Sequence, residues 1–147
     1  MNRINLICLG VRDIAKSLAF YKSIGFKTYE KEDKPAIVFF HNQGTKLELF
    51  PIEGLAKDIN GANPPDLSQG GFNGITLAIN MKSEKEVDGF MELVLKSAGT
   101  IAKKPEKVFW GGYSGYFQDP DGYYWEVAYA DSWKFDENDM LIIEGSE

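Results

Sequence analysis

Two acidic side chains interrupt segments that otherwise look like apolar strands. Glu48 stands in Leu-Glu-Leu and Glu126 stands in Trp-Glu-Val. Because side chains alternate across a β-strand, each carboxylate points away from its apolar neighbours. On a solvated face, both are ordinary surface glutamates. In a shared concavity, their like charges would raise one pKa or require a cation between them, which suits acid–base chemistry or cation binding.

Two other side chains could take part in chemistry. His41, the one histidine, follows an apolar segment beside a turn at 42–44. It is either a partly exposed turn residue, or a general base or ligand reached from the rim of a site. Cys8, the one cysteine, shares a strand face with Leu6, and no cationic neighbour is visible to lower its pKa. A single cysteine excludes an internal disulfide and a multi-cysteine zinc site, and it fits a reducing cytosol.

Aromatic residues are abundant, with 10 Phe, 7 Tyr and 3 Trp, and many fall late in the chain. The glycine-rich stretch 109–117 contains Trp110, Tyr113 and Tyr116, which are our candidates for a stacking wall beside a ligand. The alternative is plain core and sheet packing. Its paired glycines allow close approach of a ligand, but no helix N-terminus follows to bind a phosphate.

The first half predicts a strand, a helix and three strands. Asp13 is the expected N-cap of the helix and Gly25 is expected just past its C-terminus. The expected elements span residues 4–11, 14–24, 26–31, 36–40 and 46–50.

The second half predicts the same order of elements. Ser83 and Glu86 form a capping box for the helix, and Gly99 is expected to stop it. An Asp-Pro-Asp-Gly turn at 119–122 joins the last two strands. The expected elements span residues 73–80, 84–98, 100–103, 113–118 and 123–129.

The two halves can be overlaid, which indicates an internal duplication. N-L-I-C-L-G-V at 5–11 matches N-G-I-T-L-A-I at 73–79, and L-E-L-F at 47–50 matches W-E-V-A at 125–128. Glu48 and Glu126 therefore occupy equivalent places. Because each half exposes one apolar sheet face, pairing the halves would cover both.

Composition sets the class of protein. With 147 residues, 44% of them hydrophobic, the chain can bury a core in one domain. The net charge of −6, without a basic stripe, argues against nucleic acid and anionic membranes as partners. No apolar run is long enough to span a bilayer and no leader precedes the first strand, so we expect a cytoplasmic protein.

We therefore predict a single domain over residues 1–147, made of two modules. Module 1 spans about 3–51, a linker about 52–71, and module 2 about 72–130, followed by a C-terminal extension at 131–147. The linker is rich in Pro and Gly, and only residues 54–59 could form a helical turn. A lid is the alternative interpretation of this segment.

These segments resemble the vicinal oxygen chelate superfamily, which includes glyoxalase I, extradiol dioxygenases, methylmalonyl-CoA epimerase, and the fosfomycin and bleomycin resistance proteins. The resemblance rests on N-L-I-C-L-G-V-R-D-I-A-K-S-L-A-F-Y at 5–21, I-G-F at 24–26 and D-P-D-G-Y-Y-W-E-V at 119–127. It covers about residues 3–130. It implies an α+β fold of two paired βαβββ modules whose mixed sheets curl into a cup-shaped cavity, usually in a homodimer.

The enzymes of that family bind a divalent metal through one ligand on each first strand and one on each last strand. The last-strand positions match Glu48 and Glu126, whereas the first-strand positions fall at Leu6 and Gly74, whose side chains cannot bind a metal. Two carboxylates without imidazole make a poor zinc or iron site. We assign no cofactor, and a divalent metal (Mg²⁺, Mn²⁺, Ni²⁺ or Zn²⁺) held by the two glutamates stays open as the alternative.

The resulting hypothesis is a binding protein of the glyoxalase/bleomycin-resistance type. It would hold a small, partly aromatic or cationic molecule in the cup without a tightly bound metal. We expect the ligand to contact Leu6, Gly74, Trp110, Tyr113, Tyr116 and the two glutamates. The alternative is a metal-dependent lyase, isomerase or dioxygenase, in which Glu126 is the candidate catalytic base. The sequence leaves open whether the protein is an enzyme.

Overall fold

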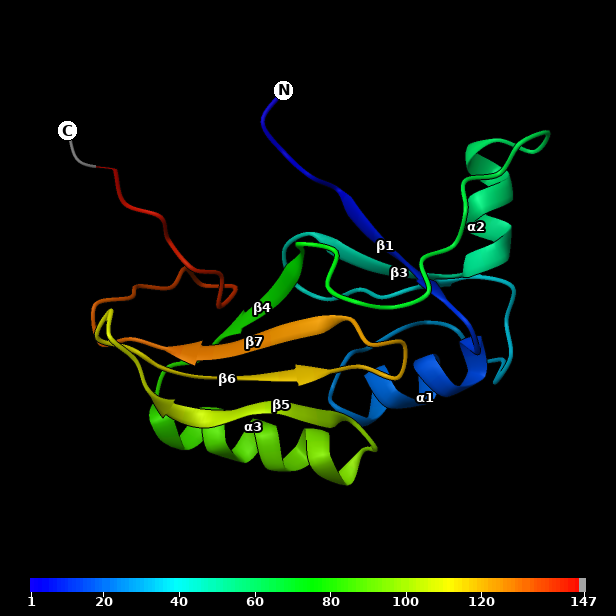
Figure 1. Ribbon diagram of the computed structural model, residues 1–147. Coiled ribbons are helices and arrows are strands. Elements are labelled where there is room, and N and C mark those ends of the chain that lie inside the picture. Colours follow the sequence, from blue (N-terminus) through cyan, green and yellow to red (C-terminus); the bar gives the residue numbers. More distant parts are fainter. Residues whose placement is uncertain (146–147) are drawn as a thin grey trace. The chain divides into compact units, whose positions relative to one another are not determined.

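A computed structural model describes residues 1–145 and divides them into two compact units (Figure 1). Unit 1 comprises residues 1–75 together with 120–122, and unit 2 comprises the remaining described residues. Residues 146–147, the end of the predicted C-terminal extension, lie outside the described residues.

Unit 1 is a three-stranded mixed sheet with two helices. The strand order is β1-β3-β2, with β1 parallel and β2 antiparallel to β3. Helix α1 contacts β3, and helix α2 contacts both β1 and β3. The elements are β1 (Leu6–Val11), α1 (Ile14–Ser23), β2 (Val38–Phe39), β3 (Lys46–Pro51) and α2 (Ile52–Ile59).

Local signals account for α1. The Asp13 carboxylate accepts a hydrogen bond from the Lys16 backbone N–H at 3.1 Å, which confirms the predicted N-cap. Gly25 follows the helix with φ 109°, a left-handed conformation that favours glycine. The apolar side of α1, which includes Leu18 and Tyr21, is buried. This burial holds α1 on the sheet.

Two parts of unit 1 differ from the prediction. The expected strand at 26–31 is reduced to an isolated bridge between Thr28 and Phe40. The first part of the predicted linker forms α2, a helix of 8 residues rather than the single turn expected at 54–59. Its Ala56 is buried, so contact with the sheet stabilises this helix.

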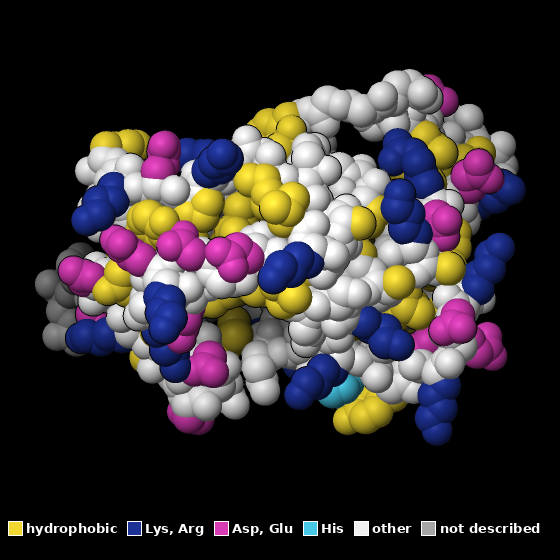
Figure 2. Space-filling model, turned by 90° about the horizontal axis from the view of Figure 1, so that it is seen from below, with side chains coloured by type: hydrophobic (Ala, Val, Ile, Leu, Met, Phe, Trp, Pro, Cys, Tyr) yellow, Lys and Arg dark blue, Asp and Glu magenta, His cyan; other side chains and the backbone are white. Residues whose placement is uncertain are grey.

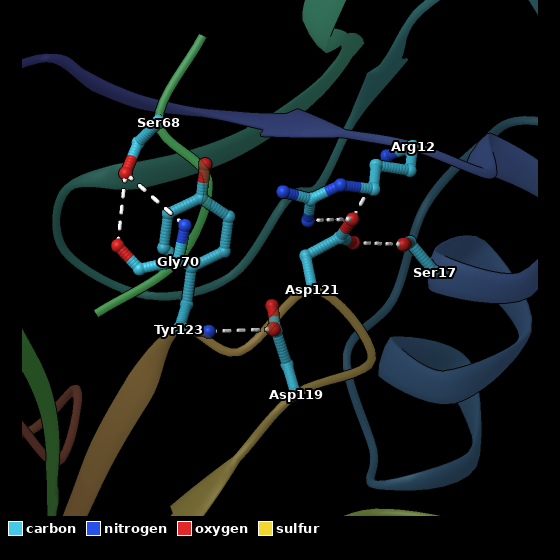
Figure 3. Close-up of polar contacts among 7 residues, drawn as sticks. All are labelled: Arg12, Ser17, Ser68, Gly70, Asp119, Asp121 and Tyr123. Carbon is cyan, nitrogen blue, oxygen red and sulfur yellow. Dashed lines mark hydrogen bonds and ion pairs between the residues drawn. The ribbon is translucent and has the colours of Figure 1, made fainter. Parts of the chain in front are cut away.

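The Asp-Pro-Asp-Gly turn contributes residues 120–122 to unit 1. Figure 3 shows Asp121 pointing between Arg12 and Ser17. Its carboxylate accepts hydrogen bonds from the Arg12 backbone N–H and the Ser17 hydroxyl, each at 2.8 Å. Gly122 has φ 88°, as the predicted turn requires. The motif is thus both a turn and an anchor on the start of α1.

Unit 2 is a four-stranded mixed sheet in the order β4-β7-β6-β5. Here β4 is parallel to β7, and the other neighbours are antiparallel. Helix α3 contacts β5, β6 and β7. The elements are β4 (Thr76–Asn80), α3 (Glu84–Lys96), β5 (Thr100–Lys107), β6 (Tyr113–Gln118) and β7 (Tyr124–Tyr129).

Helix α3 begins at the predicted capping box. The Ser83 hydroxyl accepts from the Glu86 N–H at 3.1 Å, and the Glu86 carboxylate accepts from the Lys82 N–H at 2.7 Å. Its C-terminus differs from expectation, because Ala98, with φ 67°, takes the left-handed conformation expected of Gly99. The outer side of α3, onto which Figure 2 looks, carries interspersed acidic and basic side chains.

The fold class is α+β with two mixed sheets, as predicted. In each sheet the first strand pairs in parallel with the last strand, which is what the internal duplication predicts. Among residues 1–145, no helix combines the length and apolar character needed to cross a membrane.

Candidate functional site

In unit 1, Glu48 lies at the centre of the sheet. Its partners in register are Cys8 on β1 and Phe39 on β2. Leu47 and Leu49, its chain neighbours, are buried, so Glu48 points to the opposite face by strand alternation. Glu48 is half-buried and Phe39 is 51% exposed. This face therefore presents a carboxylate between a thiol and an aromatic ring.

The Cys8 thiol is held in its protonated form. Burial raises its pKa to about 11, assisted by the charge of Glu48 and by a hydrogen bond to the Glu48 carboxylate. Asp58 on α2 acts in the same direction. This environment makes the thiol a poor nucleophile, because the thiolate is the reactive form.

In unit 2, Glu126 occupies the equivalent position. Its partners in register are Ala78 on β4 and Tyr116 on β6. The Tyr116 hydroxyl donates to Glu126 Oε2 at 2.9 Å, and the other carboxylate oxygen has no hydrogen-bond donor among residues 1–145. Burial, with the hydrogen bond to Glu126, raises the pKa of Tyr116. The carboxylate is thus oriented by one bond and keeps one oxygen for a ligand.

The three aromatic candidates separate within unit 2. Tyr116 shares the face of Glu126. Tyr113 lies on the other face, where its hydroxyl donates to Asp88 of α3 at 2.6 Å, and this bond raises its pKa to about 12. Trp110 is 43% exposed, and its ring stacks on Trp133, with centroids 5.7 Å apart and planes inclined by 22°. Tyr113 therefore does not join Glu126.

Two of the other predicted positions, Leu6 and Gly74, contribute no polar side chain. Leu6 is 46% exposed and precedes Cys8 by two residues, so it shares the face of Cys8 and Glu48. Gly74, with φ 84°, precedes β4. His41 is exposed, and its ring stacks on the Tyr29 ring, with the ring centroids 4.3 Å apart.

The donor set does not fit a resident transition metal. No group of three His, Cys, Asp or Glu side chains within the described part of the chain could hold a metal ion. In its own unit, Glu126 has Ala78 and Tyr116 beside it, and Glu48 has Cys8 and Phe39 beside it. Zinc and iron sites use three or four nitrogen, thiolate or carboxylate donors, and these neighbours add at most the single sulfur of Cys8.

Sequence reasoning missed three residues of these faces. Phe39 and Ala78 are the strand partners of the glutamates, and Trp133 is the partner of Trp110. The hairpin turn at 42–44 was a signal for Phe39, because it brings β2 beside β3. Trp133 gave no such signal, because its contact depends on the path of the C-terminal segment.

Solved structures share this fold. A glyoxalase-related enzyme from Fulvimarina pelagi is 26% identical with a TM-score of 0.86, covering 99% of this chain and 100% of that one. A lactoylglutathione lyase from Agrobacterium tumefaciens is 22% identical with a TM-score of 0.67, covering 92% and 99%. A glyoxalase/bleomycin resistance protein/dioxygenase family enzyme from Burkholderia phytofirmans PsJN is 16% identical with a TM-score of 0.74, covering 88% and 99%.

No curated protein matches the chain in sequence. The family model of the Glyoxalase/Bleomycin resistance protein/Dioxygenase superfamily matches residues 3–127, which include both glutamates and both sheets. The resemblance seen in the duplicated segments is thereby confirmed. The chain belongs to the glyoxalase/bleomycin resistance protein/dioxygenase superfamily.

Proposed function

We propose that this protein binds a small, partly aromatic or cationic molecule at its glutamate-bearing sheet faces, without a tightly bound metal. The observation that carries this proposal is the environment of Glu126. Its carboxylate is oriented by Tyr116, keeps one oxygen free of donors among the described residues, and lies beside an aromatic ring. A carboxylate next to an aromatic ring can bind an organic cation through charge and cation–π attraction.

Unit 1 supports the same chemistry. Glu48 lies between Phe39, which exposes its ring, and Cys8, whose thiol stays protonated. The face therefore carries a carboxylate beside an exposed aromatic ring. A net charge of −6 would also favour the approach of a cation.

Binding of phenethyltrimethylammonium, an aromatic cation, tests the proposal by titration calorimetry on the full chain. We expect Glu126→Gln to lower the affinity about tenfold, because the swap removes the charge and keeps the shape. Glu92→Gln, on the exposed side of α3, is the matched control and should leave the affinity unchanged. Binding that is lost on adding EDTA would overturn the metal-free proposal, as would equal affinities for all three proteins.

A metal-dependent enzyme is the second candidate, a lyase, isomerase or dioxygenase that uses Glu48 and Glu126. One observation favours it: the similar chain from Fulvimarina pelagi is described as a glyoxalase-related enzyme. Metal analysis after purification without chelator tests this candidate. A stoichiometric metal that is lost in Glu126→Gln would support it. Metal at trace level, together with no retention of added Mn²⁺ or Ni²⁺ on dialysis, would overturn it.

A further inference from the structure

In unit 1, the chain that leaves the last strand folds back over the face that carries Glu48. Helix α2 follows β3 directly. A Cβ added to Gly10 would approach the Ile52 side chain of α2 to 2.8 Å, and Gly10 shares the face of Cys8. Helix α2 therefore covers the Gly10 end of the Glu48 face.

In unit 2, the chain that leaves β7 also returns over the sheet. Figure 1 shows the C-terminal segment on the side of this sheet away from α3. This segment brings Trp133 onto Trp110. Asp139 of the same segment forms an ion pair with Lys82, which follows β4, and the Phe135 ring lies under the Lys82 ammonium group at 5.6 Å. These contacts fasten the segment to its own unit.

The position of Gly112 identifies the face on which Trp110 lies. The Gly112 carbonyl accepts from the Val108 N–H at 2.9 Å across the β5–β6 hairpin, so the backbone at Gly112 continues β6. Its missing side chain would point to the face of Ser114 and Tyr116 by alternation. A Cβ there would meet the Trp110 ring at 1.8 Å. The indole therefore occupies the face that carries Glu126.

Each unit has a cover over its glutamate-bearing face: α2 in unit 1, and the stacked Trp110 and Trp133 in unit 2. Within its own unit, each cover lies near the end of the last strand. In unit 1, the Gly10–Phe50 pair under α2 follows the Cys8–Glu48 pair by two residues. In unit 2, the Asn80–Ala128 pair follows the Ala78–Glu126 pair by two residues. On its other side, Ala128 pairs with Ser114 of β6, and Gly112 is the residue before Ser114 on the same face. Ser114 and Ala128 are 2% and 0% exposed. The duplicated module thus includes a cover after its last strand.

We propose that Trp133 is a ligand-contacting residue of the Glu126 face, where it forms one aromatic wall with Trp110. This proposal rests on the proposed function and assigns its ligand class. The Trp110 ring lies against Gly112, which is four residues from Tyr116 along β6, or about 14 Å. A ligand that reaches both groups is an extended aromatic cation, with its ring on the tryptophan wall and its charge at Glu126. The cover of unit 1 has no tryptophan, so this preference belongs to unit 2.

Two cations of similar length distinguish the contribution of the aromatic contact from that of the charge. Phenethyltrimethylammonium carries a ring, and hexyltrimethylammonium carries the same charge without a ring. We expect Trp133→Ala to lower the affinity for the phenethyl cation about five- to tenfold, because stacking and cation–π contact are lost. The affinity for the hexyl cation should fall less than threefold. Trp133→Phe keeps a ring and should restore most of the affinity. Asn138→Ala, at an exposed position of the same segment, should leave both affinities unchanged.

Gly112→Ala tests the wall without changing either tryptophan. The new Cβ would displace the Trp110 ring, so the loss should match that of Trp133→Ala. Circular dichroism gives a check that needs no ligand, because the stacked indoles should give an exciton couplet that is absent in Trp133→Phe and Gly112→Ala. Gly112→Ala and Trp133→Phe keep the inference testable if Trp133→Ala does not fold.

The outcomes distinguish the inference from the function. If Glu126→Gln weakens binding while Trp133→Ala and Gly112→Ala bind the phenethyl cation like the unmodified chain, the wall is overturned and the proposed function stands. If Trp133→Ala weakens both cations equally, the aromatic preference is overturned. If the unmodified chain binds neither cation, both proposals are overturned.

Discussion

At the scale of single residues, neighbours distinguish two glutamates that the duplication makes equivalent. Glu48 has Cys8 and Phe39 beside it, and Glu126 has Ala78 and Tyr116. The phenol of Tyr116 orients one oxygen of the Glu126 carboxylate, whereas neither Cys8 nor Phe39 offers Glu48 a donor of that strength. We therefore expect Glu126 to be the more precisely positioned of the two.

The reactivity of the Cys8 thiol depends on the neighbouring Glu48 carboxylate, whose charge helps to raise the pKa of the thiol. With a pKa of about 11, the thiol should react with iodoacetamide at pH 8 on the order of a hundredfold more slowly than an ordinary exposed thiol. The rate should rise with pH until the thiolate forms near that pKa. Glu48→Gln removes a negative charge and should lower the pKa, so alkylation at pH 8 should be faster. Mass spectrometry measures both rates.

Asp58→Asn is the control for this measurement. The charge of Asp58 is the smallest of the causes that raise the Cys8 pKa, so this change should accelerate alkylation less than Glu48→Gln does. An acceleration that is equal or larger would contradict the described environment of Cys8.

At the scale of elements, the short connections do more than reverse the chain. The turn at 119–122 supplies Asp121 to the start of α1, and the segment after β3 forms α2. Asp119 holds the turn itself, because its carboxylate accepts from the Tyr123 N–H at 2.9 Å (Figure 3). The turn therefore stabilises both its own conformation and the entry into α1.

Asp121→Asn should lower the free energy of unfolding by about 1–3 kcal/mol. The side chain is 5% exposed, and its two acceptor oxygens receive the Arg12 N–H and the Ser17 hydroxyl. An amide places a donor where one of these oxygens was, which leaves a buried group unsatisfied. Urea unfolding followed by circular dichroism measures the loss.

Arg12→Ala is the matched comparison. The Arg12 guanidinium lies 3.8 Å from Asp121 and its side chain is 58% exposed, so this ion pair should contribute less than about 1 kcal/mol. The backbone N–H that bonds Asp121 remains in this variant. A larger loss in Arg12→Ala than in Asp121→Asn would show that the ion pair, rather than the hydrogen bonds, anchors the turn.

At the scale of the whole molecule, the duplication predicts that Glu48 and Glu126 face one cavity. The family match covers both modules, and the register gives both glutamates the same place in their own sheets. The predicted homodimer belongs to this scale too, and sedimentation equilibrium of the full chain measures it.

A double-mutant cycle tests the shared cavity. If the two carboxylates repel each other, Glu48→Gln or Glu126→Gln should raise the free energy of unfolding, and the pair should be non-additive by at least about 0.5 kcal/mol. Pairing Glu48→Gln with Glu92→Gln should be additive, because Glu92 lies on the outer side of α3. Additivity in both cycles would place the two glutamates apart.

The sequence alone was sufficient for features that depend on neighbouring residues. Asp13 and Ser83 cap their helices as predicted, and Gly44 and Gly122 take positive φ in the predicted turns. These signals act over a few residues, so they can be recognised without knowledge of the rest of the fold. The duplication was also visible, because it repeats such signals in the same order.

Features that depend on distant partners emerged from the folded chain. Helix α2 begins at Ile52, after Pro51, without a side-chain cap, and it is held by β1 and β3. Strand register separates Tyr113 from Tyr116, and it brings Tyr116 beside Glu126. Trp133 meets Trp110 because the C-terminal segment turns back over its sheet. Burial and register join residues far apart in the chain, and no local pattern encodes which ones meet.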